Sequence, residues 1–232
     1  MQLTFTDSSP SCAYLPDRES TTEYEIAPMI SPAAYESRMN AGWRKFGMVL
    51  FHPVCAHCSA CRPIRVRAGM FRPDRSQTRA LKRNADLRVE IGVAKVDVAR
   101  ISLYRRYHAG QAARMGWTSE EIDGAGYRMQ FLSALVPPTE IAAWDGEELC
   151  AVALMDITPN AVSGIYHYYD PARRDRSLGT FAILQTLEYA RRLGKPYAYL
   201  GYYVAGCASM AYKSRFRPCE IQGVDGAWHD AV

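Results

Sequence analysis

The chain contains no run of apolar residues that approaches the roughly 18 needed to cross a bilayer, so we expect no membrane span. Its polar first ten residues carry no basic flank, so no secretory signal is expected. No internal repeat, low-complexity tract or obvious linker interrupts the 232 residues. Hydrophobic residues make up 48% of the sequence, enough to bury a large core in one large domain or two small ones. These features predict a globular cytoplasmic protein without a membrane partner.

Acidic residues are scarce in two stretches of the sequence. Residues 62–88 hold nine Arg and Lys against two acids, and residues 171–217 again hold nine against two. Together these stretches have a net charge of +14, whereas the net charge of the whole chain is +4, so the remaining residues have a net charge of −10. Exposed arginines are common on helices, but this concentration fits a phosphate-rich partner better than an evenly solvated surface. We therefore expect contact with a nucleic acid.

Three cysteines stand at three-residue spacing in one segment, Cys55, Cys58 and Cys61, and Cys12 lies far upstream. In a reducing cytoplasm, clustered thiols indicate metal binding rather than disulfide bonds. Thiolates are the preferred ligands of zinc and of iron–sulfur clusters, although free cysteines are often buried small hydrophobic residues. The spacing predicts an iron–sulfur cluster or zinc held by Cys12, Cys55, Cys58 and Cys61.

The second half of the chain has the clearest pattern of secondary structure. Strands are expected over 139–144 and 149–157, joined by a hairpin at Asp145-Gly146, and a third strand over 162–169. A helix is expected from Leu178, with Ser177 as its N-cap, up to Gly194, followed by a strand over 197–202 and a last helix over 207–216. Three antiparallel strands, a helix and a strand predict an α+β fold similar to the GNAT acyltransferase core.

The first half predicts a mixture of helices and strands around the cysteines. Helices are expected over 32–46, 77–84, 97–114 and 127–135, and strands over 64–67 and 87–93. We therefore divide the chain into a cysteine-rich N-terminal region, residues 1–136, and a GNAT-like catalytic half, residues 137–232.

Two segments of the second half suit an anionic ligand. The turn Ser177-Leu178-Gly179 opens a helix, where backbone N–H groups and the helix dipole favour anions, and Arg174 and Arg176 precede it. The second segment interleaves aromatic rings with cations, a combination that stacks bases and neutralises phosphates, although an aromatic strand is more often part of the core. Its candidate residues are Tyr199, Tyr202, Lys213, Arg215 and Phe216.

Several motifs in one order resemble the arginyl-tRNA–protein transferase family, including its bacterial aspartate/glutamate leucyltransferase branch. The motifs are Gly42-Trp43-Arg44-Lys45-Phe46-Gly47, Cys55-x-x-Cys58-x-x-Cys61-Arg-Pro63-Ile-Arg65, Ser177-Leu178-Gly179-Thr180, Leu200-Gly201-Tyr202 and Met210-Ala-Tyr212-Lys213-x-Arg215-Phe216. The resemblance implies a GNAT-type second half, a cysteine-rich N-terminal region and charged tRNA as donor. It extends from Cys12 to Trp228 and favours leucine as the amino acid transferred.

An aminoacyl ester is already activated, so its transfer to an amine needs no ATP and no CoA. The enzyme must align ester and amine, accept a proton and stabilise the oxyanion. Asp156, Asp170 and His167 are candidate bases. Arg174 and Arg176 would meet the tRNA end, Tyr199, Tyr202 and Phe216 would stack on its terminal adenosine, and Lys213 and Arg215 would bind phosphate or an acidic acceptor side chain.

Three alternatives remain open at this point. The segment from Tyr104-Arg-Arg-Tyr107-His108 to Trp117 resembles the arginyl enzymes, which would make arginine the amino acid transferred to the same acidic N-termini. An acetyl-CoA N-acetyltransferase would share the fold, but its pyrophosphate loop is glycine-rich, whereas Arg174-Asp-Arg-Ser-Leu-Gly179 is poor in glycine. A metal-bearing RNA-binding module without catalysis would also explain the cysteines and the charge.

Overall fold

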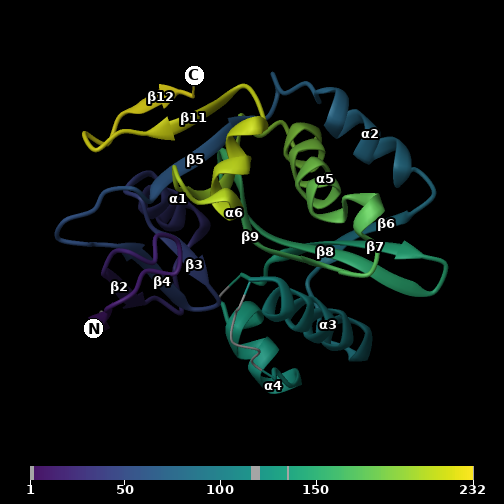
Figure 1. Ribbon diagram of the computed structural model, residues 1–232, viewed down its shortest axis with the longest axis horizontal. Helices are drawn as coiled ribbons and strands as arrows, with labels where there is room; N and C mark the ends of the chain where they lie inside the picture. Colours follow the sequence, from purple (N-terminus) through teal and green to yellow (C-terminus); the bar gives the residue numbers. More distant parts are fainter. Residues whose placement is uncertain (1–2, 116–120, 135, 232) are drawn as a thin grey trace.

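The computed structural model describes residues 3–115, 121–134 and 136–231. A small antiparallel sheet comes first, with its strands in the order β1-β2-β4-β3. It consists of β1 (Leu3–Ser9), β2 (Ser20–Ile26), β3 (Arg44–Phe46) and β4 (Val49–Pro53). Helix α1 (Pro32–Asn40) connects β2 to β3, and the Ser31 hydroxyl caps it by accepting a 3.2 Å hydrogen bond from the N–H of Ala34. This sheet, purple to blue in Figure 1, lies beside a larger one.

Eight strands form the larger sheet, in the order β12-β11-β5-β10-β9-β8-β7-β6. They are β5 (Arg62–Arg67), β6 (Arg88–Val93), β7 (Thr139–Asp145), β8 (Glu148–Ile157), β9 (Ala161–Tyr169), β10 (Tyr197–Tyr203), β11 (Cys219–Gln222) and β12 (Trp228–Asp230). Neighbours pair antiparallel except β9 and β10, which are parallel. Because β5 and β6 come from the first 136 residues, the division expected at residue 137 runs through a single sheet.

Helices cover both faces of the large sheet (Figure 1). Helices α2 (Arg75–Arg83) and α5 (Leu178–Arg192) pack on one face, where α5 buries Ile183, Leu184 and Leu187. Helix α3 (Val98–Met115), helix α4 (Gly124–Tyr127) and the π-helical turn η1 (Arg128–Leu132) pack on the other, in an aromatic core. The molecule therefore has a mixed α/β fold with a layer of helices on each side. In the described part of the chain no helix is both long and apolar enough to cross a membrane.

Strands β9 and β10 lie side by side only where they begin. Ala161–Ser163 pair with Tyr197–Tyr199, and the two strands share no paired residues beyond that point. On its other side β9 remains paired with β8 as far as Tyr169, apart from a register shift next to Gly164. We call the region between residues 164–169 and 200–203 the fork. Within it, the β10-facing edge of β9 has no paired strand.

The elements expected between residues 139 and 202 are confirmed, including the hairpin, where Gly146 adopts a φ of +58°. Three expected helices differ. The helix expected over 32–46 ends at Asn40, because Gly42 turns the chain with a φ of +92° and β3 then pairs with β4. Residues 207–216 form the short helix α6 (Ala208–Ala211) and the 3₁₀ turn η3 (Tyr212–Arg215). Of residues 127–135, the end of α4 and η1 are helical, and residue 135 lies outside the described residues, as does Trp117.

Candidate active site

The fork brings Lys213 of η3 close to His167 of β9. The Lys213 ammonium donates a 2.9 Å hydrogen bond to the carbonyl of Tyr202, and burial lowers its pKa to about 8, with a further contribution from Arg44. Burial and then Lys213 lower the pKa of His167 to about 4. At neutral pH the fork therefore holds a charged lysine beside an uncharged imidazole, whose Nε2 lies 3.5 Å from the hydroxyl of Thr186 on α5.

The start of α5 adjoins the fork through Tyr169. A Cβ on Gly179 would lie 2.8 Å from Cε1 of Tyr169, so this close approach requires glycine. Ser177 adopts a left-handed φ of 55°, and its side chain makes no capping hydrogen bond, unlike the expected N-cap. Leu178 is buried in the core. No side-chain cap therefore occupies the first backbone N–H groups of α5, and anion binding there stays a prediction.

The two arginines before α5 differ in their surroundings. Arg174 is exposed on the 3₁₀ turn η2 (Arg174–Arg176). Arg176 instead forms an ion pair of 2.9 Å with Asp86, whose hydrogen bonds raise the arginine pKa. Asp170, a candidate base, is also engaged, because it is 6% exposed, accepts a 2.9 Å hydrogen bond from the N–H of Ala172 and lies 3.5 Å from Arg173 Nε. Arg176 therefore ties η2 to the segment after α2, and Asp170 stabilises the turn after β9.

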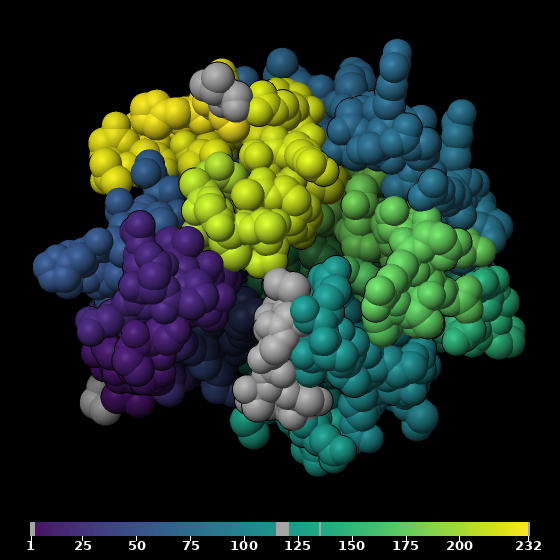
Figure 2. All heavy atoms as spheres, viewed as in Figure 1, coloured from purple at the N-terminus to yellow at the C-terminus, as the bar shows by residue number. Residues whose placement is uncertain are grey.

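The two basic stretches meet in space. Near its beginning, α2 is joined to η3 by a 3.1 Å hydrogen bond from the side chain of Gln77 to the carbonyl of Arg215. At its end, Arg83 donates a 2.7 Å hydrogen bond to the carbonyl of Asp175 in η2. Figure 2 shows α2, in blue, adjoining the green start of α5 on this face of the molecule. The elements that these contacts join carry exposed cations from both stretches, which are Arg75, Arg79, Lys82, Arg174 and Arg215. We call these five residues the basic face.

The aromatic residues expected to stack on the terminal adenosine are buried. Tyr199, Tyr202 and Phe216 are 1%, 5% and 2% exposed, so none of them presents a ring face to a base in this structure. The Tyr202 hydroxyl donates a 2.7 Å hydrogen bond to the carbonyl of Gly42, and the guanidinium of Arg44 lies 5.3 Å from both tyrosine rings. The expectation of stacking does not hold here, because these rings join β10 to the small sheet and the core instead.

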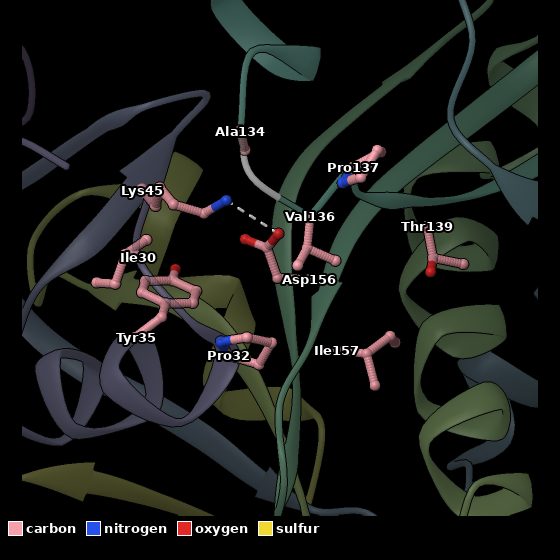
Figure 3. Close-up of a pocket in the computed structure, with 10 residues that line it drawn as sticks. All are labelled: Ile30, Pro32, Tyr35, Lys45, Ala134, Val136, Pro137, Thr139, Asp156 and Ile157. Carbon is pink, nitrogen blue, oxygen red and sulfur yellow. Dashed lines mark ion pairs between the residues drawn. The ribbon is translucent and has the colours of Figure 1, made fainter. Parts of the chain in front are cut away.

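Asp156, the remaining candidate base, lies at the end of β8 beside a small pocket (Figure 3). Its Oδ1 is 3.1 Å from Nζ of Lys45 on β3, and both side chains are almost fully buried. Burial raises the pKa of Asp156, and Lys45 opposes that shift. In the sequence, Lys45 stands out only as part of the Gly42–Gly47 motif. A lysine inside an aromatic motif was the one sign in the sequence that this position is special. Its acidic partner could not be identified, because Asp156 lies 111 residues further along the chain.

The four cysteines expected to bind a metal lie in one part of the small sheet and its loops. Arg18 donates a 3.4 Å hydrogen bond to Sγ of Cys58, and hydrogen bonds from the Ala60 backbone and Arg18 lower the pKa of Cys58. Burial and then Cys12, Cys55 and Cys58 raise the pKa of Cys61 to about 12. Their chemistry fits zinc or an iron–sulfur cluster. Among the described residues, however, no three His, Cys, Asp or Glu side chains are grouped as metal ligands.

Two family models match the chain. The model described as arginine-tRNA-protein transferase, N terminus, matches residues 10–79, and its C-terminus counterpart matches residues 99–223. The aspartate/glutamate leucyltransferase of Stenotrophomonas maltophilia (strain K279a) is 38% identical, over 85% of this chain and 80% of that protein. The aspartate/glutamate leucyltransferase of Marinobacter nauticus is 37% identical, over 94% of this chain and 92% of that protein. The crystal structure of FemX has a similar fold, with a TM-score of 0.54 at 8% identity over 89% of this chain and 70% of that one.

Proposed function

Since the chain belongs to the arginine-tRNA-protein transferase family, we propose that it transfers leucine from leucyl-tRNA to the N-terminal amino group of proteins that begin with Asp or Glu. It is a transferase enzyme, as its motifs indicated. Leucine rather than arginine is proposed because the relatives described above are named aspartate/glutamate leucyltransferases. Arginine transfer to the same acceptors is the second candidate.

The observation that carries this proposal is the fork, with Lys213 inside it and the start of α5 beside it. The ester-bearing end of a tRNA would enter between β9 and β10, with a phosphate at the N–H groups of Leu178 and Gly179 and the acceptor stem on the basic face. A GNAT-like arrangement, in which β7, β8, β9, α5 and β10 form the catalytic core, is part of this proposal. We propose that the reaction takes place in the cytoplasm, because charged tRNA is its donor.

The reaction balances without a further reactant. The amine nitrogen bonds to the ester carbonyl carbon, the bond from that carbon to the tRNA ribose oxygen breaks, and the proton lost by the nitrogen replaces the bond on the ribose oxygen. The Lys213 ammonium would stabilise the negative charge that develops on the carbonyl oxygen. Asp156 would accept the proton from the amine, because burial strengthens this carboxylate as a base. His167, with its pKa of about 4, would be a weak base.

The cysteine centre has no step in this reaction. We propose that Cys12, Cys55, Cys58 and Cys61 hold zinc or an iron–sulfur cluster, on the chemistry of four thiols in neighbouring loops. A bound centre would fix the loop from Cys55 to Cys61 against the start of β5, the next strand to β10.

The proposed function is tested by offering the protein four donors separately with a peptide that begins with Asp. These donors are leucyl-tRNA, arginyl-tRNA, acetyl-CoA and uncharged tRNA. The proposal expects an amide-linked leucine on the peptide from leucyl-tRNA alone. Transfer of an acetyl group would identify a CoA-dependent enzyme, and tRNA binding without transfer from any donor would identify an RNA-binding module; either result would contradict the proposal.

A further inference from the structure

A pocket next to the fork contains a buried ion pair. Nζ of Lys45 and Oδ1 of Asp156 are 3.1 Å apart, with their side chains 5% and 10% exposed. Figure 3 shows the two charged groups pointing toward each other, with the ring of Tyr35 beside them. The cavity has a volume of about 60 Å³, and its walls are largely apolar, formed in part by Ile30 and Val136. This volume is roughly four times what one water molecule requires, so the pocket admits a small polar group.

The ion pair leaves one oxygen of the carboxylate unused. Oδ2 of Asp156 is buried and accepts no hydrogen bond from any of the described residues. Buried polar atoms are rarely left in this condition, because each loses its hydration without compensation. If the only role of the pair were to attach β3 to β8, both oxygens would be expected to have donors. An unpartnered oxygen in a pocket wall instead indicates a ligand that donates a hydrogen bond.

The position of the pocket in the sheet places it at the vertex of the fork. Asp156 pairs with Ser163 across β8 and β9, and Ser163 pairs with Tyr199 across β9 and β10. This is the last row of paired residues before β9 and β10 diverge. The Tyr35 hydroxyl, which lines the pocket, lies 3.4 Å from the hydroxyl of Ser163. A nucleophile held at Oδ2 would therefore stand next to the point where the fork opens.

The charges of Lys45 and Asp156 restrict the kinds of ligand that the pocket can bind. An apolar side chain would leave Oδ2 of Asp156 without a donor. A cation such as a guanidinium would be repelled by the Lys45 ammonium, and a lone anion by the Asp156 carboxylate. A group that carries an ammonium and a carboxylate a few bonds apart satisfies both members of the pair. The first residue of a protein that begins with Asp or Glu is such a group.

We propose that Lys45 and Asp156 form the acceptor-specificity pocket of this enzyme, which takes the first residue of a protein with an acidic N-terminus. The terminal amine donates a hydrogen bond to Oδ2 of Asp156, and the acidic side chain accepts one from Lys45. Charge-assisted hydrogen bonds of this kind distinguish a carboxylate from an amide of the same shape. The inference rests on the proposed transfer to acidic N-termini and assigns that selectivity to Lys45.

The test compares peptides that begin with Asp, Asn and Lys, each assayed with leucyl-tRNA, in the wild type and in Lys45→Met, Lys45→Arg and Lys95→Met. Lys95 is an exposed lysine that does not line the pocket, so it controls for the loss of one positive charge. We expect Lys45→Met to lower the preference for Asp over Asn by roughly tenfold or more, through KM for the peptide, because one charge-assisted hydrogen bond is lost. KM for leucyl-tRNA should remain unchanged, and Lys45→Arg and Lys95→Met should keep the preference.

If Lys45→Met folds poorly, peptide binding to a second variant tests the same inference. The double variant Lys45→Met/Asp156→Asn buries no unpaired charge, and its affinity for the Asp peptide can be measured by calorimetry without tRNA. Loss of discrimination between the Asp and Asn peptides in this variant supports the pocket. An unchanged Asp preference in either variant would overturn the inference while leaving the proposed transfer intact. A wild type that transfers no leucine to any peptide would instead reject the proposed function.

Discussion

Asn84, which ends α2, donates a 2.7 Å hydrogen bond from its side chain to the backbone carbonyl of Arg176. This contact joins the two basic stretches of the sequence at the turn before α5. Asn84 is buried, and it also donates a 2.8 Å hydrogen bond to the carbonyl of Ala80, so the end of the helix is fixed against η2. The exposed cations of α2 and η2 are consequently carried by elements that are fixed to one another.

Removing Arg79, Lys82 and Arg174 together, each as alanine, should weaken tRNA binding and reduce its salt dependence. Each lost phosphate contact lowers the slope of log affinity against log salt by about 0.7–0.9, so the triple variant should lose roughly 2 from that slope. Affinity titrations at several salt concentrations measure this. Arg192→Ala is the matched control, since Arg192 is exposed at the far end of α5. A slope equal to that of the wild type would show that the basic face does not contact the phosphates of the tRNA.

Lys213→Met should lower kcat by about a hundredfold, the usual cost of one oxyanion-stabilising donor, with little change in tRNA affinity. Because the pKa of Lys213 is lowered to about 8, the rate advantage of the wild type over the variant should shrink as the pH rises through 8 and the ammonium is lost. The measurement is a pH profile of single-turnover transfer by both proteins. If the variant lost tRNA affinity and kept kcat, Lys213 would be a binding residue instead.

His167 should make the protein less stable in mild acid. Its pKa is about 4 in the folded chain and about 6.5 when unfolded, so between these values the unfolded state binds the extra proton. The free energy of unfolding should therefore fall by about 2 kcal/mol from this residue between pH 7.5 and pH 5. Urea unfolding of the wild type and His167→Gln at both pH values isolates the contribution. Equal pH dependence in the two proteins would show that His167 titrates normally.

The Lys45–Asp156 pair should show strong thermodynamic coupling. Lys45→Met alone leaves a buried carboxylate without its cation, which should cost about 3–5 kcal/mol of unfolding free energy. Lys45→Met/Asp156→Asn should be destabilised by less than the sum of the two single variants, because no charge remains buried alone. Denaturant unfolding of the four proteins completes the cycle. Additive effects would mean that the two side chains are not coupled in solution.

Anaerobically purified protein should contain iron or zinc at a near-stoichiometric level. Replacing Cys58 with Ser should lower that content, because a hydroxyl is a poor substitute for a thiolate ligand. Elemental analysis identifies the metal, and visible absorption separates a cluster from zinc. Protein prepared without oxygen that contains neither metal would contradict the prediction. A sample exposed to air would show only whether the centre is sensitive to oxygen.

The parts of the fold that local patterns specify were predictable. Alternation, the Asp145-Gly146 turn and the termination at Gly194 located β7, β8, β9 and α5. Strand β1 was missed because every residue in it is exposed, so no apolar alternation marks it. The roles of Arg176 and Lys45 were missed for a different reason. Their acidic partners, Asp86 and Asp156, lie about a hundred residues away in the sequence, and only the pairing of distant strands and helices brings them together.

The central claim is tested most directly by the mass of a reporter peptide that begins with Asp, after incubation with the purified protein and total charged tRNA. The account predicts a product heavier by one leucine residue, joined to the terminal amine, and no such product from a peptide that begins with Lys. A product heavier by one arginine residue would contradict the proposed donor. A peptide that gains no amino acid from any charged tRNA would contradict the proposed transfer itself.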